Sequence, residues 1–215
     1  MIDLYSRATP NGRKIAIALE ESGLAYRVHA VDFARREQKS PEFLSLNPNG
    51  RIPVIVDNAP GGGGDGKVPL ALFESGAILF YIAEKSGRLL PEDALARIEA
   101  LKWLFFASSQ VTHTAMQVHW LVRLKEQGKP APHLEDYRTE LRRLYGVLDG
   151  VLTGRKWLAG DAYSIADIAA WTWIECYRMH GLVLESFPAL TDWFAHVEKR
   201  PATRKGYDIP PRETA

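Results

Sequence analysis

Two short motifs constrain the fold of this chain more than any other part of it. The first, Ile52-Pro53, opens the apolar run 54–57, and the second, Glu74-Ser75-Gly76, follows the apolar run 70–73. A proline at the start of a strand donates no ladder hydrogen bond, and a cis bond before it would point the backbone groups of Ile52 outward. A peptide could then pair with those groups as an added strand.

Ser75 is expected to begin a helix that runs to Gly87, with a favourable cap at each end. The first N–H groups of a helix have no partner within it, and its dipole attracts an anion. A carboxylate at this position would accept hydrogen bonds from the hydroxyl and the N–H of Ser75. Together, the two motifs predict a site that binds the main chain and the α-carboxylate of a small peptide.

Composition excludes several classes of partner. The net charge of the 215 residues is +1, which gives no general attraction to nucleic acid or to an anionic membrane, and no apolar run is long enough for a membrane helix. Cys176 is the one cysteine, so no intramolecular disulfide can form, and the N-terminus lacks the pattern of a secretory signal. We therefore expect a soluble cytoplasmic protein that binds neither nucleic acid nor membrane.

The first part of the chain, residues 1–87, mixes strand and helix patterns. Strands are expected at 2–5, 26–31, 53–57 and 69–73, and helices before Gly23, at 41–46 and after Ser75. The glycine run 61–64 could suggest a phosphate-binding loop, but it lacks the Lys-Ser/Thr ending and a following helix. A flexible turn between two antiparallel strands is the better interpretation.

Strand patterns end after a short linker at 88–91, and residues 92–215 are predicted to form an all-helical domain. Apolar residues fall at helical spacing between Tyr137 and Leu152, and further helices are expected over 92–125, from Ser164 to near Met179, and around 190–197. The tail from Pro201 is basic and proline-rich, so we expect it to be loosely attached. The fold class is an α/β domain followed by an all-α domain.

Ser164 and Asp167 have the spacing of a capping box, in which each side chain bonds to the backbone N–H of the other residue. Tyr163 and Ile168 are placed as a hydrophobic staple across the same helix start. The motif therefore predicts a structural role, which is to nucleate the central helix of the second domain.

Three motifs occur in this order: Ile52-Pro53, Glu74-Ser75-Gly76 and the Ser164–Asp167 cap. Their order and spacing resemble the glutathione S-transferase family over most of the chain. The stretches 3–5, 9–14 and 72–78 more narrowly resemble its bacterial Nu class, whose members are glutathione-dependent disulfide reductases. The resemblance implies a thioredoxin-like domain over 1–87 that binds glutathione and an all-helical domain over 92–215 with a second-substrate pocket. It also implies a homodimer, with glutathione as cosubstrate and no metal.

The resemblance also assigns roles within the peptide site. The backbone of Ile52, before Pro53, would pair with the cysteinyl part of glutathione. Ser75 would bind the γ-glutamyl carboxylate and Glu74 the ammonium group. Residues similar to further family contacts lie in two nearby loops: Gln38 would contact the peptide, and Arg51 or Lys39 would meet the glycine carboxylate.

The loop 5–11 would adjoin the glutathione sulfur, and it contains no cysteine, which excludes a mixed disulfide with this loop. By resemblance to the Nu class, Thr9 and Asn11 are the expected catalytic residues, because both can donate hydrogen bonds to sulfur. Asn11 also lies at a helix start, which favours a thiolate. Tyr5 is interpreted as a packed strand residue and Ser6 as a turn residue.

Other reactive side chains receive structural interpretations. His113 and His119 are poorly spaced for a metal on a helix, and we expect no carboxylate or cysteine near them. Cys176 is expected in the middle of a helix as a buried, inert thiol. Whether His119 and Trp120 line the second-substrate pocket stays open.

The sequence leaves three functions open. A glutathione thiolate could reduce a small disulfide, or it could be conjugated to an electrophile. A binding module without catalysis is the third alternative, and the retained Ile52-Pro53, Glu74 and Ser75 count against it.

Overall fold

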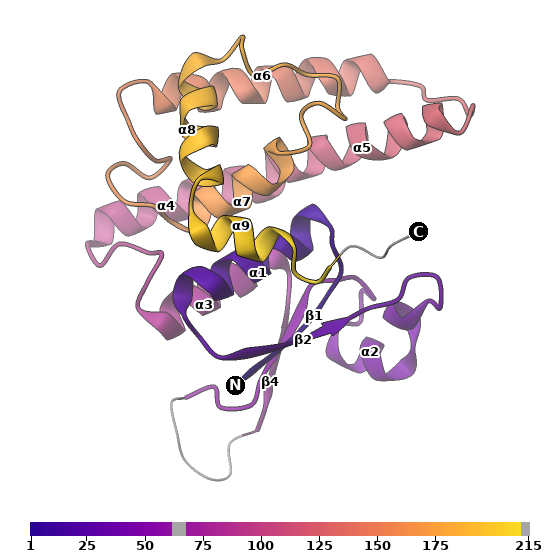
Figure 1. Ribbon diagram of the computed structural model, residues 1–215, viewed down its shortest axis with the longest axis vertical. Coiled ribbons are helices and arrows are strands. Elements are labelled where there is room, and N and C mark those ends of the chain that lie inside the picture. Colours follow the sequence, from indigo (N-terminus) through magenta and orange to yellow (C-terminus); the bar gives the residue numbers. More distant parts are fainter. Residues whose placement is uncertain (62–67, 212–215) are drawn as a thin grey trace. The chain divides into compact units, whose positions relative to one another are not determined.

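The computed structural model describes residues 1–61 and 68–211, which form two compact units. The first unit contains Met1–Leu89 and the C-terminal segment that starts at Arg200, and the second contains Leu90–Lys199. Figure 1 labels most of their helices and strands. Most of the glycine run 61–64 lies outside the described residues.

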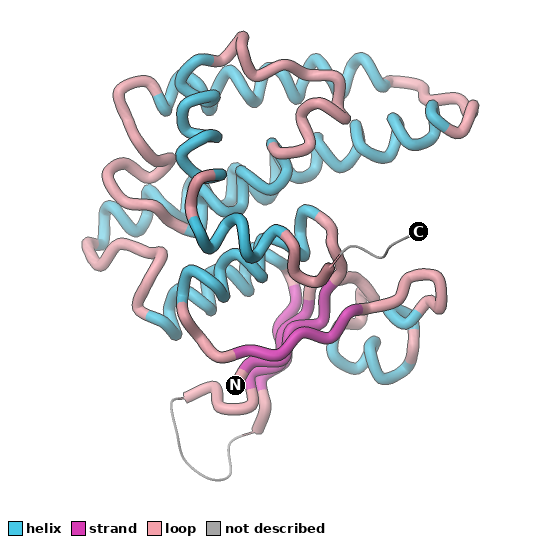
Figure 2. Tube along the Cα trace, viewed as in Figure 1, coloured by secondary structure: helices cyan, strands magenta, loops and turns pink. Residues whose placement is uncertain are grey.

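A four-stranded mixed sheet forms the centre of the first unit (Figure 2). Its strands are β1 (Ile2–Ser6), β2 (Tyr26–Ala30), β3 (Val54–Asp57) and β4 (Leu70–Phe73), in the order β2-β1-β3-β4. β1 is parallel to β2 and antiparallel to β3, which is antiparallel to β4. The expected α/β fold and the antiparallel pairing of the last two strands are therefore confirmed.

The helices of this unit are α1 (Pro10–Ser22), α2 (Pro41–Leu46), α3 (Ser75–Ser86) and α9 (Pro201–Tyr207), with a 3-10 turn at Glu37–Lys39. α1 carries a nearly continuous buried face and packs against α3 and α9. It ends at Gly23, whose φ of 71° is in the left-handed region that glycine adopts without steric cost.

The expectation of a loosely attached tail is wrong, because α9 packs along α1 (Figure 1). Arg200 forms a bidentate ion pair with Glu21, with N–O distances of 2.6 and 2.8 Å, and Arg13 Nε donates to the carbonyl of Tyr207 at 3.1 Å. A Cβ at Gly206 would lie 2.6 Å from the Ile17 Cα, so this close approach requires glycine.

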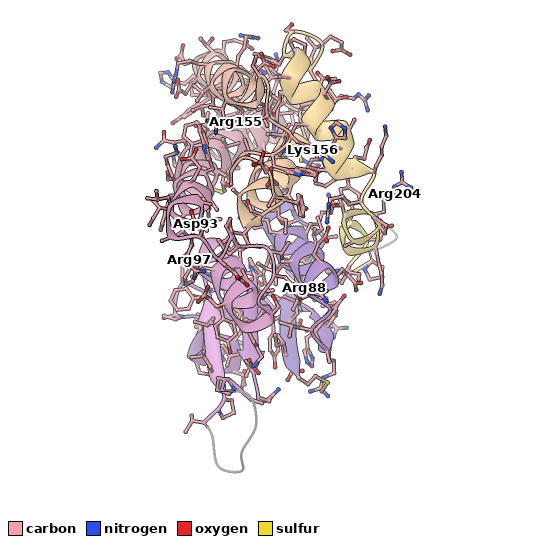
Figure 3. The ribbon with its side chains drawn as sticks, turned by 90° about the vertical axis from the view of Figure 1, so that its left-hand side faces the viewer. Arg88, Asp93, Arg97, Arg155, Lys156 and Arg204 are labelled. Carbon is pink, nitrogen blue, oxygen red and sulfur yellow. The ribbon has the colours of Figure 1, made fainter. Side chains whose placement is uncertain are left out.

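The second unit is built from helices alone in the part that the structure describes, apart from one isolated bridge (Figure 2). They are α4 (Ala94–Phe106), α5 (Thr112–Glu126), α6 (Leu134–Leu152), α7 (Ile165–Ile174) and α8 (Pro188–Glu198). A π-helical turn at Ala107–Val111 joins α4 to α5. Figure 3 shows Asp93 at the start of α4, where its side chain caps the helix by accepting from the Ala96 N–H at 2.9 Å.

α7 is the core helix of this unit, and every one of its residues is buried. Asp167 Oδ2 accepts from the Ser164 N–H at 2.9 Å, and the capping box is complete as predicted. The helix ends at Ile174, earlier than expected, so Cys176 lies beyond it rather than in its middle. No described helix is long and apolar enough to cross a membrane.

Candidate functional site

The register of the sheet brings the two sequence motifs to one edge. Tyr5 lies opposite Val54, and Val54 lies opposite Phe73. Neighbouring strands are about 4.8 Å apart, so the residues just beyond these three positions are neighbours. They are the loop after β1, Ile52-Pro53 before β3, and Glu74-Ser75 after β4.

The Ile52-Pro53 bond is cis, and Pro53 is buried. Asn47 orders the preceding loop: its Nδ2 donates to the Arg51 carbonyl at 2.7 Å, and its Oδ1 accepts from the Asn49 N–H at 3.0 Å. Within residues 1–61 and 68–211, no backbone hydrogen bond joins Ile52 to another backbone group. Its main chain is thus able to pair with an extended peptide.

Glu74 occupies the N-cap position of α3 with φ 68° and ψ 112°, and its side chain makes no capping hydrogen bond. Ser75 is therefore the first helical residue, as expected, but no described side chain provides the cap predicted at this end. A non-glycine residue in this region of φ costs roughly 1 kcal/mol or more and often marks a ligand site. The exposed Glu74 carboxylate and the uncapped N–H groups of α3 together suit a ligand that carries both an ammonium and a carboxylate.

Thr9 caps α1, with its Oγ1 accepting from the Gly12 N–H at 3.2 Å. A hydroxyl that accepts a hydrogen bond still has its own proton to donate. Asn11 follows in the first turn. A Cβ at Gly12 would lie 2.2 Å from the Arg7 carbonyl oxygen, so only glycine lets the helix start this close to the end of β1.

Lys14 is a charged residue at this edge that sequence reasoning missed. Its side chain has no exposed surface, and burial lowers its pKa to about 7, while the negative charge of Glu74 acts in the opposite direction. The available signal was its position one helical turn before Ala18, which is buried on the same helix. Lys14 places a titratable cation beneath the site.

Residues 38–51 contain one expected contact to the peptide, Gln38, and two candidates for binding the glycine carboxylate, Lys39 and Arg51. The Gln38 Oε1 is buried and has no hydrogen-bond partner among the described residues. Such an atom is expected where a bound ligand supplies the donor. Lys39 and Arg51 are both exposed, but Lys39 Nζ already donates to the Asn49 carbonyl at 3.2 Å. Of the two candidates for the glycine carboxylate, Arg51 is therefore the more available.

Tyr5 packs as expected, stacked on His29 with ring centroids 4.6 Å apart and edge-on to Phe43. Ser6 is the last residue of β1 rather than part of a turn, and its buried hydroxyl donates to the Arg7 carbonyl at 3.4 Å. Ser6 thus has no exposed group to offer a ligand, which leaves Thr9 and Asn11 as the expected sulfur donors of this loop.

A surface hollow in the second unit lies between the end of α5 and the start of α6. The residues around it are Lys125, Ala131, His133, Leu134, Glu135 and Asp136. None of them belongs to the predicted peptide site. The hollow contains charged side chains at a helix turn, and we assign it no part in the chemistry.

Comparison with known proteins agrees with this geometry. Residues 2–84 match the model of the glutathione S-transferase N-terminal domain, and residues 111–201 match that of the C-terminal domain. Disulfide-bond oxidoreductase YfcG of Escherichia coli is 43% identical over 94% of this chain and 93% of its own length.

Two solved structures are similar across both units. A glutathione transferase from Burkholderia graminis, with two glutathione molecules bound per subunit, has a TM-score of 0.88 and 42% identity over 98% of this chain and 89% of that one. One from Pseudomonas putida, with one glutathione disulfide bound per subunit, has a TM-score of 0.87 and 40% identity over 97% and 91%. With both domains matched and near-complete coverage of such relatives, this chain belongs to the glutathione S-transferase family.

Proposed function

We propose that this protein is a glutathione-dependent enzyme that reduces small disulfides through a glutathione thiolate. The observation that carries the proposal is the single sheet edge where Ile52-Pro53, the uncapped start of α3 and the Thr9-capped start of α1 meet. The relatives add support, because similar structures hold glutathione or its disulfide and YfcG is named as a disulfide-bond oxidoreductase.

In this proposal the γ-glutamyl end of glutathione binds at the start of α3. Its carboxylate accepts hydrogen bonds from the Ser75 N–H and hydroxyl, and its ammonium meets the Glu74 carboxylate. The cysteinyl backbone pairs with Ile52 next to Pro53. Gln38 accepts a hydrogen bond from the peptide, and Arg51 meets the glycine carboxylate.

The sulfur then lies beside the loop 5–11, where Thr9 and Asn11 are the proposed catalytic residues. A thiol has a pKa of about 8.5, and lowering it by one or two units requires about 1.4–3 kcal/mol. A hydroxyl, an amide and a helix end can supply that much by stabilising the thiolate. No separate general base is needed, because the proton leaves to solvent when glutathione binds.

The reaction has two exchange steps. The bound thiolate attacks one sulfur of the substrate disulfide, forming a mixed disulfide and expelling the other sulfur as a thiolate, which takes up a proton. A second glutathione thiolate attacks the glutathione sulfur of the mixed disulfide, releasing the second substrate thiol and glutathione disulfide. Because two thiol-form glutathione molecules are consumed, we place the enzyme in a reducing compartment such as the cytoplasm.

Steady-state turnover of two substrates tests this reaction against conjugation. We expect 2-hydroxyethyl disulfide to be reduced with a kcat/KM well above that for conjugation of 1-chloro-2,4-dinitrobenzene. Efficient conjugation without disulfide reduction would replace the proposal with a conjugating transferase. Absence of glutathione binding in calorimetry at millimolar ligand would instead indicate a non-catalytic module.

We further propose that the protein is a homodimer whose contact includes α4. Leu95, Ile98 and Phe105 expose 81%, 63% and 68% of their surface, whereas Trp103 and Leu104 are buried. Exposed apolar side chains gathered on one helix are typical of an interface between subunits.

A further inference from the structure

His119, Cys176 and His180 form a cluster in the second unit that the proposed reaction does not use. One ligand atom from each residue lies within 4.8 Å of the others. His119 comes from α5, and the other two come from the turns after α7. The sequence interpretation was wrong here: a cysteine does lie near His119, and Cys176 is partly exposed.

The two imidazoles have unused nitrogen atoms. His180 has no exposed surface, and neither of its ring nitrogens has a hydrogen-bond partner among the described residues. The Nδ1 of His119 is also buried without such a partner. Buried polar atoms of native proteins are nearly always satisfied, so three unsatisfied nitrogens next to one sulfur require an explanation.

Aromatic rings fix the cluster in place. Trp173 stacks on His180 with ring centroids 6.5 Å apart and meets His119 edge-on at 6.1 Å. Tyr145 is fully buried and lies beside Cys176. Rigid side chains of this kind hold ligands in position before an ion arrives.

We propose that His119, Cys176 and His180 bind one soft metal ion, and that this ion is Cu(I). Ligands at about 2.0–2.3 Å from a shared ion are about 3.4–4 Å apart in three-coordinate or four-coordinate geometry. Because the ligand atoms of the cluster lie within 4.8 Å of one another, the cluster needs to contract by at most about 1.4 Å. Binding replaces the thiol proton with the metal, and the proton is released to solvent.

Charge and ligand number favour Cu(I) over Zn(II). Cu(I) and one thiolate sum to zero, whereas Zn(II) and one thiolate leave a positive charge. Arg123 and Arg138 act on the two imidazoles, Glu126 acts on His119, and Glu175 accepts from the Cys176 Sγ at 3.7 Å, so these four groups together supply no net negative charge. Structural zinc also takes four ligands, and the described cluster offers three, of which the thiolate is a ligand that selects Cu(I).

Competition with a chelator tests the proposal on the purified full-length protein. Cu(I), kept reduced by ascorbate without oxygen or glutathione, is supplied as its coloured bathocuproine disulfonate complex. We expect the wild-type protein to withdraw one equivalent and the Cys176→Ser variant to bind at least 100-fold more weakly. The His113→Asn variant, which changes the other histidine of α5, should match the wild type. X-ray absorption should show one sulfur and two nitrogen ligands.

Several results would overturn the proposal. They are failure of the wild type to compete, equal competition by Cys176→Ser, or a coordination shell without sulfur. Tight binding of one equivalent of Zn(II) through these residues would overturn the choice of ion. Disulfide reduction by Cys176→Ser should equal that of the wild type, which separates loss of metal binding from loss of folding or of the proposed reaction.

Discussion

The side-chain oxygen of Thr9 accepts a hydrogen bond of 3.2 Å from the Gly12 N–H, which leaves the Thr9 hydroxyl proton available to a ligand. The Thr9→Val variant keeps the shape but loses both interactions. We expect the pKa of bound glutathione, measured by thiolate absorbance, to rise by about one unit, because a donor to the sulfur is lost. Disulfide reduction at pH 7 should fall roughly three- to eightfold, because the thiolate fraction falls by that factor when a pKa of about 6.5–7.5 rises by one unit.

The Thr9→Ser variant is the matched control, because it retains the hydroxyl. It should keep both the thiolate pKa and the capping bond. Loss of the helix cap alone should lower the free energy of unfolding by about 1 kcal/mol. A melting curve of Thr9→Val measures this loss of stability separately from the change in thiolate pKa. An unchanged thiolate pKa in Thr9→Val would show that the sulfur lies elsewhere.

Glu74 is expected to recognise the ammonium of the γ-glutamyl group, and a ligand without that group provides the test. The Glu74→Gln variant should bind glutathione at least tenfold more weakly in calorimetry, because a charge-assisted bond is lost. It should bind the deamino analogue of glutathione as the wild type does. Equal weakening for both ligands would mean that Glu74 acts through the backbone at its φ of 68° and not through its charge.

Local patterns predicted much of the fold because they are decided by neighbours in the chain. The strand at 2–5, the proline before β3 and the Ser164–Asp167 spacing each depend on a few consecutive residues, and all three are confirmed. α9 was missed because its seven residues are too short for an apolar period. Its position depends on a contact between Gly206 and Ile17, which are far apart in the sequence.

The site was predictable in its residue types but not in its electrostatics. Ile52-Pro53 and Glu74-Ser75 could be paired because the start of one strand and the end of the next lie at the same edge when the two strands are antiparallel neighbours, as expected here. The burial of Lys14 could not be predicted from the sequence, because that prediction requires knowing that α3 and α9 both pack on α1. The meeting of His119 with Cys176 depends likewise on where α7 ends, and a helix end that no glycine or proline marks is poorly determined by sequence.

The exposed apolar side chains of α4 predict a dimer, and lysines introduced among them should dissociate it. The chain has a mass of 24.1 kDa, and sedimentation should give twice that for the wild type. The double variant Ile98→Lys, Phe105→Lys should sediment as a monomer, because a lysine is rarely accommodated at the centre of an apolar interface. Val183→Lys, at another exposed apolar position, is the control. A monomeric wild type would contradict the proposal.

Asp167 accepts hydrogen bonds from four donors, and we expect its loss to be among the most destabilising changes in the second unit. Its Oδ1 accepts from the Leu158 N–H at 3.0 Å and from Trp193 Nε1 at 2.8 Å, and its Oδ2 accepts from the N–H and hydroxyl of Ser164. In Asp167→Asn an amide NH₂ faces one pair of these donors. The free energy of unfolding in urea should fall by roughly 2–4 kcal/mol.

The Asp192→Asn variant controls for the change of charge, because Asp192 is exposed and lies next to Trp193 on α8. Surface substitutions of this kind usually change stability by less than about 0.5 kcal/mol. Equal effects in the two variants would mean that the buried network around Asp167 contributes little.

Lys14 predicts how stability depends on pH. Burial lowers its pKa from 10.5 to about 7, so between these values the unfolded chain holds a proton that the folded chain has lost. Stability therefore increases with pH across this window, and the cost of burying the lysine is greatest below pH 7. For one proton the slope approaches about 1.4 kcal/mol per pH unit between roughly pH 8 and 9.5.

Urea unfolding at several pH values, compared between the wild type and Lys14→Met, isolates this contribution. The wild type should gain stability relative to Lys14→Met as pH rises from 7 to 9.5. Lys205→Met is the control, because it removes a lysine with 68% of its side chain exposed, and it should follow the wild type. Parallel curves for Lys14→Met and the wild type would mean that Glu74 holds the proton on Lys14 in the folded state. The lysine would then act as a fixed cation beneath the peptide site, because the attraction of Glu74 would outweigh the penalty of burial.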